Sequence, residues 1–189
     1  MSERSECTCE EKLDAAIESL IYVFSSRDGL MRKSAREALV VIGRPAIPSL
    51  IQALADKNKN VRWESAKALE EIGDPSAAQA LVARLKQDNF GIRWIAAESL
   101  VKFGKDGLRP LFLELLQNPD SGFLRDGAHH VLYSIAGKDP SLQGILSPVI
   151  DGLGAVSGAK DVVPYIQAAL EALDIEAESV EEDELLGDS

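Results

Sequence analysis

The sequence is poor in the residues that build most metal and catalytic sites. Its 189 residues include only two cysteines, Cys7 and Cys9, and two histidines, His129 and His130. A structural zinc site needs about four ligands, and a C-x-C pair also disfavours a relaxed disulfide. Adjacent histidines point about 100° apart on a helix, so they do not readily share an ion. No serine or cysteine is evidently paired with His130. We therefore expect no metal, no cofactor and no catalytic residue.

Long apolar runs are missing as well. No stretch approaches the roughly 18 apolar residues that a membrane span needs. The first 12 residues are polar and carry four glutamates, without the basic start and apolar stretch of a secretory signal. Neither glycine-rich phosphate-binding motif is present in a suitable context. We expect a cytoplasmic protein that binds no membrane.

The net charge of −11 is distributed unevenly. Residues 174–189 hold eight acids and no base, which leaves a net charge of −3 on residues 1–173. This composition predicts an acidic disordered tail over 174–189, which keeps the protein soluble or engages a basic partner. The polar residues 1–12 are expected to form a flexible segment, and 13–173 the folded domain.

A repeat of about 31 residues determines the expected fold. Four arginines (Arg32, Arg62, Arg93 and Arg125) lie 30, 31 and 32 residues apart, and each is followed by a glycine: Gly43, Gly73, Gly104 and Gly137. One residue before each arginine the side chain is apolar, three after it is small, seven after it is leucine, and ten after it is Ile or Phe. These offsets fall on one face of a helix. The glycine is a typical helix stop.

A second helical stretch lies between these arginine helices. The clearest begins at Asp74-Pro75, an N-cap and first-turn pair. The other stretches are 13–25, 45–55, 108–117 and 141–153, and a last helix over 161–173 lacks the arginine start. Short helix pairs cannot bury their apolar faces alone, so they must stack. The sequence predicts an all-α fold, a right-handed α-solenoid of about five antiparallel helix pairs.

The segment from Asn60 to Pro75, Asn-Val-Arg-Trp-Glu-Ser-Ala-Lys-Ala-Leu-Glu-Glu-Ile-Gly-Asp-Pro, resembles the HEAT-repeat family. Within it, the short phycobilisome-lyase-like repeats are most similar, and the resemblance covers about 13–173. It implies that the arginine helices line the concave side. It also implies that the arginine and the acid or amide before it bond between neighbouring repeats. These residues are Asp28, Arg32, Asn58, Arg62, Asp88, Arg93, Asp120 and Arg125. The fourth copy has one extra residue before Gly137.

An arginine column could also mark an anion or nucleic-acid site. A structural ladder is the better interpretation, because guanidinium donors suit carbonyls and acids of adjacent units. The net charge of −3 on the folded part also argues against a basic groove for nucleic acid.

Exposed positions on the concave side are expected just outside the buried offsets, at +1, +5 and +8. The two tryptophans, Trp63 and Trp94, share position +1 of adjacent repeats. Tryptophan often dominates binding energy, although both rings could instead lie flat over the repeat junctions. The predicted strip for a protein partner consists of Trp63, Lys67, Trp94, Glu98, His130 and Tyr133.

These patterns favour a non-enzymatic interaction or scaffold module that binds a protein partner on its concave face. The resemblance offers an alternative, an accessory role in attaching tetrapyrroles (bilins) to light-harvesting proteins or removing them. A weaker alternative is DNA binding, as in HEAT-like glycosylases. HEAT-repeat iron hydroxylases use several His-Glu pairs, and this sequence has none.

Overall fold

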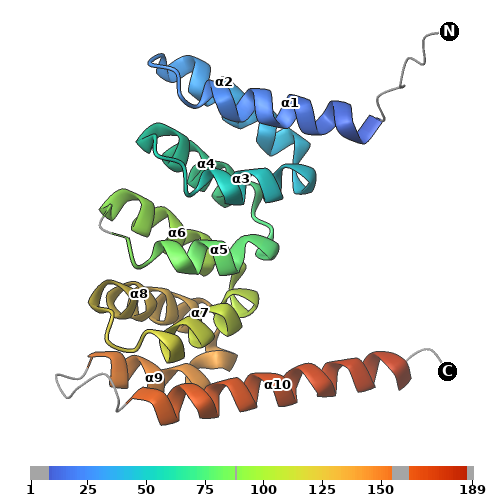
Figure 1. Cartoon of the computed structure of the whole chain (residues 1–189). Coiled ribbons are helices and arrows are strands. Elements are labelled where there is room, and N and C mark those ends of the chain that lie inside the picture. The colour runs from blue at the N-terminus through green and yellow to red at the C-terminus, as the bar shows by residue number, and fades with distance from the viewer. Residues whose placement is uncertain (1–8, 88, 155–161, 187–189) are drawn as a thin grey trace, which may run out of the picture.

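The structure, a computed structural model, describes residues 9–87, 89–154 and 162–186, with side chains as far as Asp174. This part of the chain is helical and contains no strand. In the described residues, ten α-helices follow one another along a stack (Figure 1). They are α1 (Cys9–Val23), α2 (Gly29–Ile42), α3 (Ile47–Ala53), α4 (Lys59–Ile72), α5 (Ala78–Arg84), α6 (Phe90–Phe103), α7 (Lys105–Gln117), α8 (Gly122–Lys138), α9 (Gln143–Gly154) and α10 (Val163–Leu186). Short 3₁₀ turns at Arg44–Ala46, Pro75–Ala77 and Pro140–Leu142 precede α3, α5 and α9.

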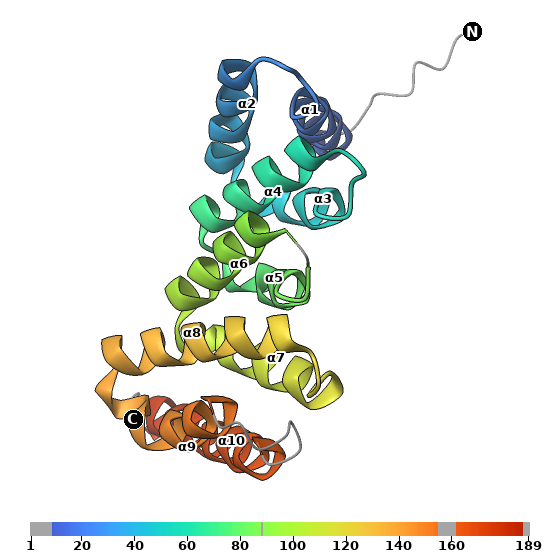
Figure 2. The ribbon, with the colours of Figure 1, turned by 90° about the vertical axis from the view of Figure 1, so that its left-hand side faces the viewer.

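The helices form two parallel rows. The arginine helices α2, α4, α6 and α8 pack on one another in sequence, and α1, α3, α5 and α7 make the second row (Figure 2). Two columns of buried side chains hold the first row together: the small residues Ala35, Ser65, Ala96 and Ala128, and the leucines Leu39, Leu69, Leu100 and Leu132. The small side chains let neighbouring helices approach closely, and the leucines fill the space between the rows. The predicted all-α solenoid is confirmed.

Glycine ends three of the arginine helices as expected. Gly43, Gly73 and Gly104 have φ of 72°, 73° and 57°, a backbone region that favours residues without a Cβ. Gly137 differs, because α8 continues through it to Lys138. The prediction that Gly137 stops its helix is therefore wrong. Asp139 caps the end of α8 and begins the turn into α9.

The last helix pair joins the stack in the opposite order. The helix α9 returns beside α8, in the row of arginine helices, and α10 packs against α7 and α9. Arg125 on α8 donates to the carbonyl oxygens of Gly152 and Leu153 at 3.4 and 3.1 Å, which fixes the end of α9. Arg109 and Asp174 form an ion pair between α7 and α10. In the terminal pair the first helix, α9, thus lies in the row of arginine helices, and the second helix, α10, lies in the other row.

The helix ends do not coincide with the predicted domain limits. The helix α1 begins at Cys9, ahead of residue 13, and α10 runs on to Leu186, past residue 174. Residues 1–8 and the side chains of the acidic segment beyond Asp174 lie outside the described part. The limits of the three predicted segments therefore stay predictions.

Asp74 gives the fold a testable dependence on pH. Its carboxylate accepts from the Ser76 N–H at 2.9 Å and forms an ion pair with Arg44 of the preceding unit. The hydrogen bonds from Ser76, together with Arg44, lower the pKa of Asp74 from 3.8 to about 2. Because the folded-state pKa lies below the unfolded value, this stabilisation is present above about pH 4 and is lost as pH falls towards 2. The expected result is that Asp74→Asn lowers the urea midpoint at pH 5 but not at pH 2.

Circular dichroism during urea titration at several pH values measures this effect. Arg44→Gln serves as the matched control and should show a smaller loss, because the Ser76 hydrogen bonds remain. An Asp74→Asn deficit of equal size at pH 5 and pH 2 would contradict the assignment.

Candidate functional site

A surface cavity of about 290 Å³ lies between α6 and α8. Counted from Arg93 and Arg125, each lining position on α8 lies one residue later in the repeat than its counterpart on α6. The lining residues are Phe90, Arg93, Trp94 and Ala97 from α6, with Phe123, Asp126, Gly127 and His130 from α8. Phe90, Trp94 and Phe123 are all exposed. Exposed aromatic side chains around a hollow are typical of binding surfaces.

Trp94 is the centre of the aromatic group. Its ring stacks on Phe90, one helical turn earlier, with the centroids 6.3 Å apart. The centroid of the His130 ring, on α8, lies 5.1 Å from that of Trp94. The indole therefore contacts two rings and keeps part of its surface open to solvent.

Arg93 connects the two helices without using a carboxylate. Its guanidinium carbon lies 4.1 Å from the ring centroid of Phe123 and 5.8 Å from that of Phe90. Its Nη1 donates to the carbonyl oxygen of Gln87 at 2.6 Å. The cation thus stacks on an aromatic face of the next repeat while it closes the loop before its own helix.

A polar contact fixes the other side of the cavity. His130 Nε2 and Glu98 Oε1 are 2.9 Å apart and again join α8 to α6. Both side chains are partly exposed, so this contact adds more to orientation than to stability. It holds the imidazole beside Trp94.

The order of one Phe-Gly dipeptide distinguishes the junction between α6 and α8 from the one between α4 and α6. The Trp63 ring covers Gly91 so closely that a Cβ on Gly91 would lie 2.4 Å from Trp63 Cζ3. In the next repeat the order is reversed, Gly122-Phe123 instead of Phe90-Gly91. Phe123 is therefore the counterpart of Gly91 in this repeat. Because it has a large side chain, Trp94 cannot cover it in the way that Trp63 covers Gly91. Trp94 stacks on Phe90 and His130 instead, and space remains between the helices.

The structure brings together only part of the predicted strip. Trp94, Glu98 and His130 form one group. Trp63 covers the junction at Gly91, the alternative that the sequence left open. Lys67 pairs with Glu70 on its own helix. Tyr133 stacks on His129, with centroids 6.4 Å apart. The described ring contacts do not join the two indoles.

The predicted ladder needs correction. Asp28 and Asn58 accept from N–H groups of their own helices, at Leu30 and Asn60, and so act as N-caps within one repeat. Their short side chains reach the first helical turn more easily than a neighbouring unit. Asn89 and Ser121 cap α6 and α8. The bond between repeats predicted for Asp120 stays a prediction, and Asp88 lies outside the described residues.

Three arginines of the ladder donate to carbonyls of the loop before their own helix. Arg32 donates to Ser26 at 2.9 Å, Arg62 to Asp56 and Lys57 at 2.7 and 3.0 Å, and Arg93 to Gln87. Arg32 also reaches the next repeat, with Nε 3.2 Å from Glu64 Oε1, and Arg125 reaches α9. All four arginines therefore donate hydrogen bonds within the protein.

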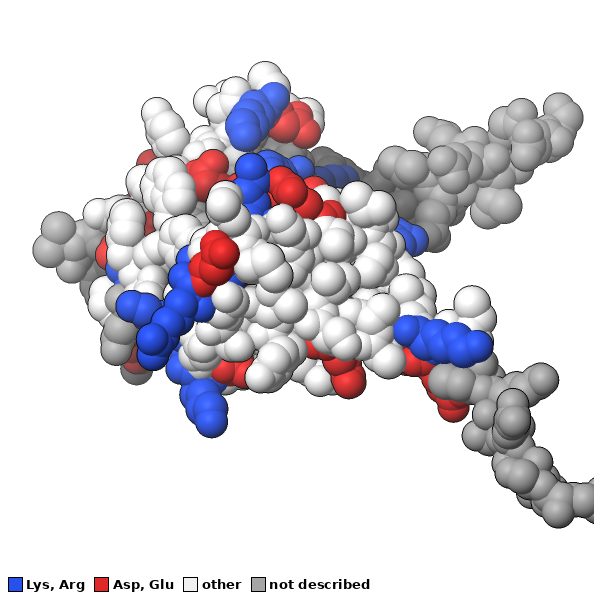
Figure 3. All heavy atoms as spheres, turned by 90° about the horizontal axis from the view of Figure 1, so that it is seen from above, with Lys and Arg blue, Asp and Glu red and all other residues white. Residues whose placement is uncertain are grey.

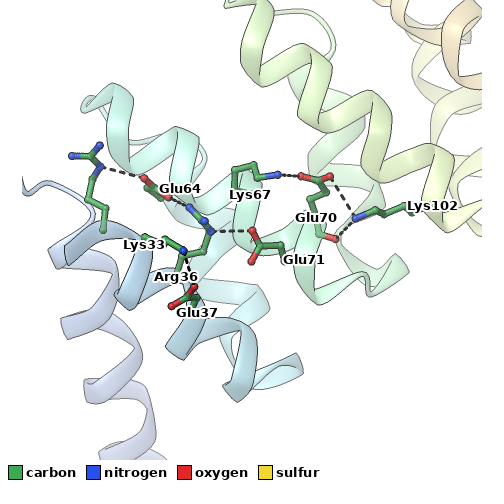
Figure 4. A network of polar contacts seen from close by, with 9 residues as sticks. Lys33, Arg36, Glu37, Glu64, Lys67, Glu70, Glu71 and Lys102 are labelled. Carbon is green, nitrogen blue, oxygen red and sulfur yellow. Dashed lines mark hydrogen bonds and ion pairs between the residues drawn. The ribbon is translucent and has the colours of Figure 1, made fainter. Parts of the chain in front are cut away.

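Charged side chains link the first three arginine helices (Figure 4). Glu64 is buried and receives both Arg32 and Arg36 from α2. Arg36 also lies 3.0 Å from Glu71, and Lys102 of α6 lies 3.5 Å from Glu70. A buried carboxylate is stable only when it is paired in this way. Sequence reasoning missed Glu64, because its column holds Ser34, Ile95 and Gly127 elsewhere.

The described residues contain neither a cluster of metal ligands nor a helix that could cross a membrane. No cluster of three or more His, Cys, Asp or Glu side chains is arranged to hold a metal ion. No described helix combines the length and the apolar character that crossing a bilayer requires. Cys9 is exposed and free, and Cys7 lies outside the described part.

The chain is similar to HEAT-repeat proteins in sequence and in structure. The sequence profile of HEAT repeats matches residues 17–100 and 47–133, which together span more than half of the chain. Among solved structures, one chain from the complex of CpcE and CpcF of phycocyanin lyase from Nostoc sp. PCC7120 is 25% identical. The superposition has a TM-score of 0.55 and covers 83% of this chain and 99% of that chain. No curated sequence matches.

The contact between Trp63 and Gly91 can be tested with a matched pair of substitutions. Gly91→Ala forces the indole to move, whereas a Cβ at Gly122, in the same turn of α8, meets nothing within 4 Å. We expect Gly91→Ala to be about 1–2 kcal/mol less stable than Gly122→Ala, the usual cost of overpacking.

In a Trp94→Phe background, Trp63 is the sole tryptophan, and its emission should shift to the red in Gly91→Ala only. Denaturant unfolding and fluorescence spectra provide the two measurements. Equal spectra for both alanine variants would mean that Trp63 does not cover Gly91.

Proposed function

We propose that this chain, which belongs to the HEAT-repeat family, is a non-enzymatic module that holds a protein partner at the cavity between α6 and α8. The partner would lie along the row of arginine helices, the side predicted to be concave. The observation that carries this proposal is the exposed aromatic group of Phe90, Trp94 and Phe123 around that cavity.

The energetics of the site suit a protein anchor. A volume of about 290 Å³ lies at the lower end for pockets that take whole small molecules, and it suits one inserted side chain. Tryptophan and arginine are the residues most often found where binding energy concentrates. Trp94 and Arg93 are already held by Phe90, His130 and Phe123, so binding costs little ordering of these side chains.

The chemistry of the lining residues supports a non-enzymatic role. A histidine oriented by a carboxylate, as His130 is by Glu98, can serve as a general base. The lining residues include no serine, threonine, cysteine or lysine for it to activate. The pair is better explained as a positioning contact for Trp94.

Capture from native lysate with matched variants tests the proposal. Trp94→Ala and Phe90→Ala should each reduce recovery of the captured partner by at least about tenfold, which corresponds to losing a binding hot spot. Tyr165→Ala on α10 is the control, because Tyr165 is 47% exposed and Trp94 is 50% exposed.

Quantitative mass spectrometry measures recovery, and circular dichroism checks that helicity is unchanged. A partner recovered equally well with Trp94→Ala and Phe90→Ala would place the binding surface elsewhere.

A second candidate function rests on the structural neighbour, a chain of a phycocyanin lyase complex. By analogy, this chain would assist the attachment or removal of a bilin, a linear tetrapyrrole with two carboxylates. The cavity is small for a whole tetrapyrrole, and the Arg93 guanidinium already stacks on Phe123 and bonds Gln87. A propionate would have to displace these contacts, so we rank this function second.

Absorbance spectroscopy separates the two functions. If the protein is a partner-binding module, biliverdin mixed with the wild-type chain and with Trp94→Ala should give identical spectra. A red-shifted and sharpened long-wavelength band with the wild type, lost in Trp94→Ala, would favour the bilin function instead.

A further inference from the structure

The cavity between α6 and α8 combines exposed aromatic rings with a carboxylate that has no partner. Phe90, Trp94 and Phe123 are 68%, 50% and 43% exposed. Asp126 on α8 lines the same cavity and is exposed as well. Among the residues that the structure describes, none forms an ion pair or hydrogen bond with Asp126. Aromatic faces beside a free carboxylate are a combination that attracts cations.

The other charged groups at the cavity already have partners. Glu98 contacts His130. The Arg93 guanidinium lies over the ring of Phe123 and donates to a backbone carbonyl. Asp126 is therefore the charged lining residue that remains open to a ligand. The site contains two carboxylates, those of Glu98 and Asp126, against one guanidinium, so that a positively charged group meets a net attraction.

Arg93 shows that these rings can hold a guanidinium group. Its guanidinium carbon lies 4.1 Å from the ring centroid of Phe123 and 5.8 Å from that of Phe90. The face of an aromatic ring carries partial negative charge, and tryptophan attracts cations most strongly of the three aromatic types. Half of the Trp94 side chain is open to solvent. It offers a second surface of the kind that Arg93 already uses.

The position of Asp126 in its repeat explains why the carboxylate occurs at this junction. The residue that follows the repeated arginine is Lys33, Trp63, Trp94 or Asp126, so only the fourth copy has an acid there. Because α6 packs against α8, an indole and a carboxylate from the same position of consecutive repeats line one cavity. The junction of α4 with α6 has two tryptophans at these positions instead.

The exposed apolar surface of α2, at the N-terminal end of the stack, lacks this combination. Seen from above, this end has a broad area without charged side chains, with charges gathered around its edge (Figure 3). The charged residues of α2 are all paired, either with glutamates of α4 or with one another. The charges of α2 therefore select no ligand, whereas the carboxylate of Asp126 does.

We propose that the cavity takes a basic side chain of the protein partner, an arginine that stacks on Trp94 and pairs with Asp126. This inference rests on the proposed function, because it names the chemistry of the partner at that site. A guanidinium fits better than an ammonium group, since it is planar, stacks on aromatic faces and donates two parallel hydrogen bonds to one carboxylate. A volume of about 290 Å³ accommodates one such group.

Titration with small probes, followed by NMR, tests the proposal on the full chain. The two tryptophans each give one indole N–H signal, so that Trp63 serves as an internal reference for Trp94. The probes are N-acetyl-arginine methylamide, its neutral isostere N-acetyl-citrulline methylamide, and the anionic N-acetyl-glutamate methylamide. The arginine probe should shift the Trp94 signal with a Kd at least about fivefold below that of the citrulline probe, because ring stacking of the cation and the ion pair both contribute.

Two variants with the same change of charge identify the carboxylate. Asp126→Asn should bind the arginine and citrulline probes about equally. Asp14→Asn, at an exposed position on α1, should keep the preference for arginine. Circular dichroism confirms that both variants are folded. The proposal is overturned by a citrulline or glutamate probe that binds as tightly as arginine, or by a preference that persists in Asp126→Asn. It is overturned as well by an unshifted Trp94 signal at about 50 mM arginine probe, above the millimolar Kd that one side chain supports.

Capture from native lysate separates a failure of this inference from a failure of the proposed function. Asp126→Asn should recover less partner than the wild type. If Trp94→Ala loses the partner while Asp126→Asn recovers as much as the wild type, the cavity binds its partner without a basic side chain, and only this inference fails. If both variants recover the partner as well as the wild type does, the proposed function fails with it.

Discussion

Close stacking of the arginine helices is the interaction on which the rest of the structure depends. Each unit contributes only two short helices, which cannot bury their apolar sides without neighbours. The small side chains of Ala35, Ser65, Ala96 and Ala128 let successive helices approach. The same small residues set the spacing between successive arginine helices, and so determine which side chains of neighbouring repeats can meet. The aromatic cavity between α6 and α8 is a consequence of this stacking.

Most of the fold could be predicted from the sequence, because one column of arginines and one of leucines repeat in register. Three of the six predicted strip residues, Trp94, Glu98 and His130, do meet. Whether Trp63, Lys67 and Tyr133 join this group could not be predicted from their positions alone. The orientation of a tryptophan ring depends on the residue that faces it on the next repeat. Trp63 packs over Gly91, whereas Trp94 faces Phe123 across the cavity and does not cover α8 in this way. Gly137 does not stop its helix, because α8 continues to Lys138, where Asp139 caps it.

The junctions between repeats use different chemistry along the array. Between α2 and α4 a buried carboxylate takes two guanidinium groups, an arrangement that tolerates little rearrangement. Between α6 and α8 the contacts are rings, one cation over an aromatic face, and an exposed imidazole–carboxylate pair. Such contacts are individually weak and can adjust. The proposed binding site thus sits at an adaptable junction, while a more rigid one anchors the array nearer its N-terminus.

The exchanged order of α9 and α10 determines where further repeats could be added to the array. A further unit joined after α10 would start from the wrong row, so its arginine helix would be out of phase with α8. A unit added at the carboxyl end would therefore break the alternation of the two rows. A unit inserted between Gly73 and Asp74 would keep both rows in phase.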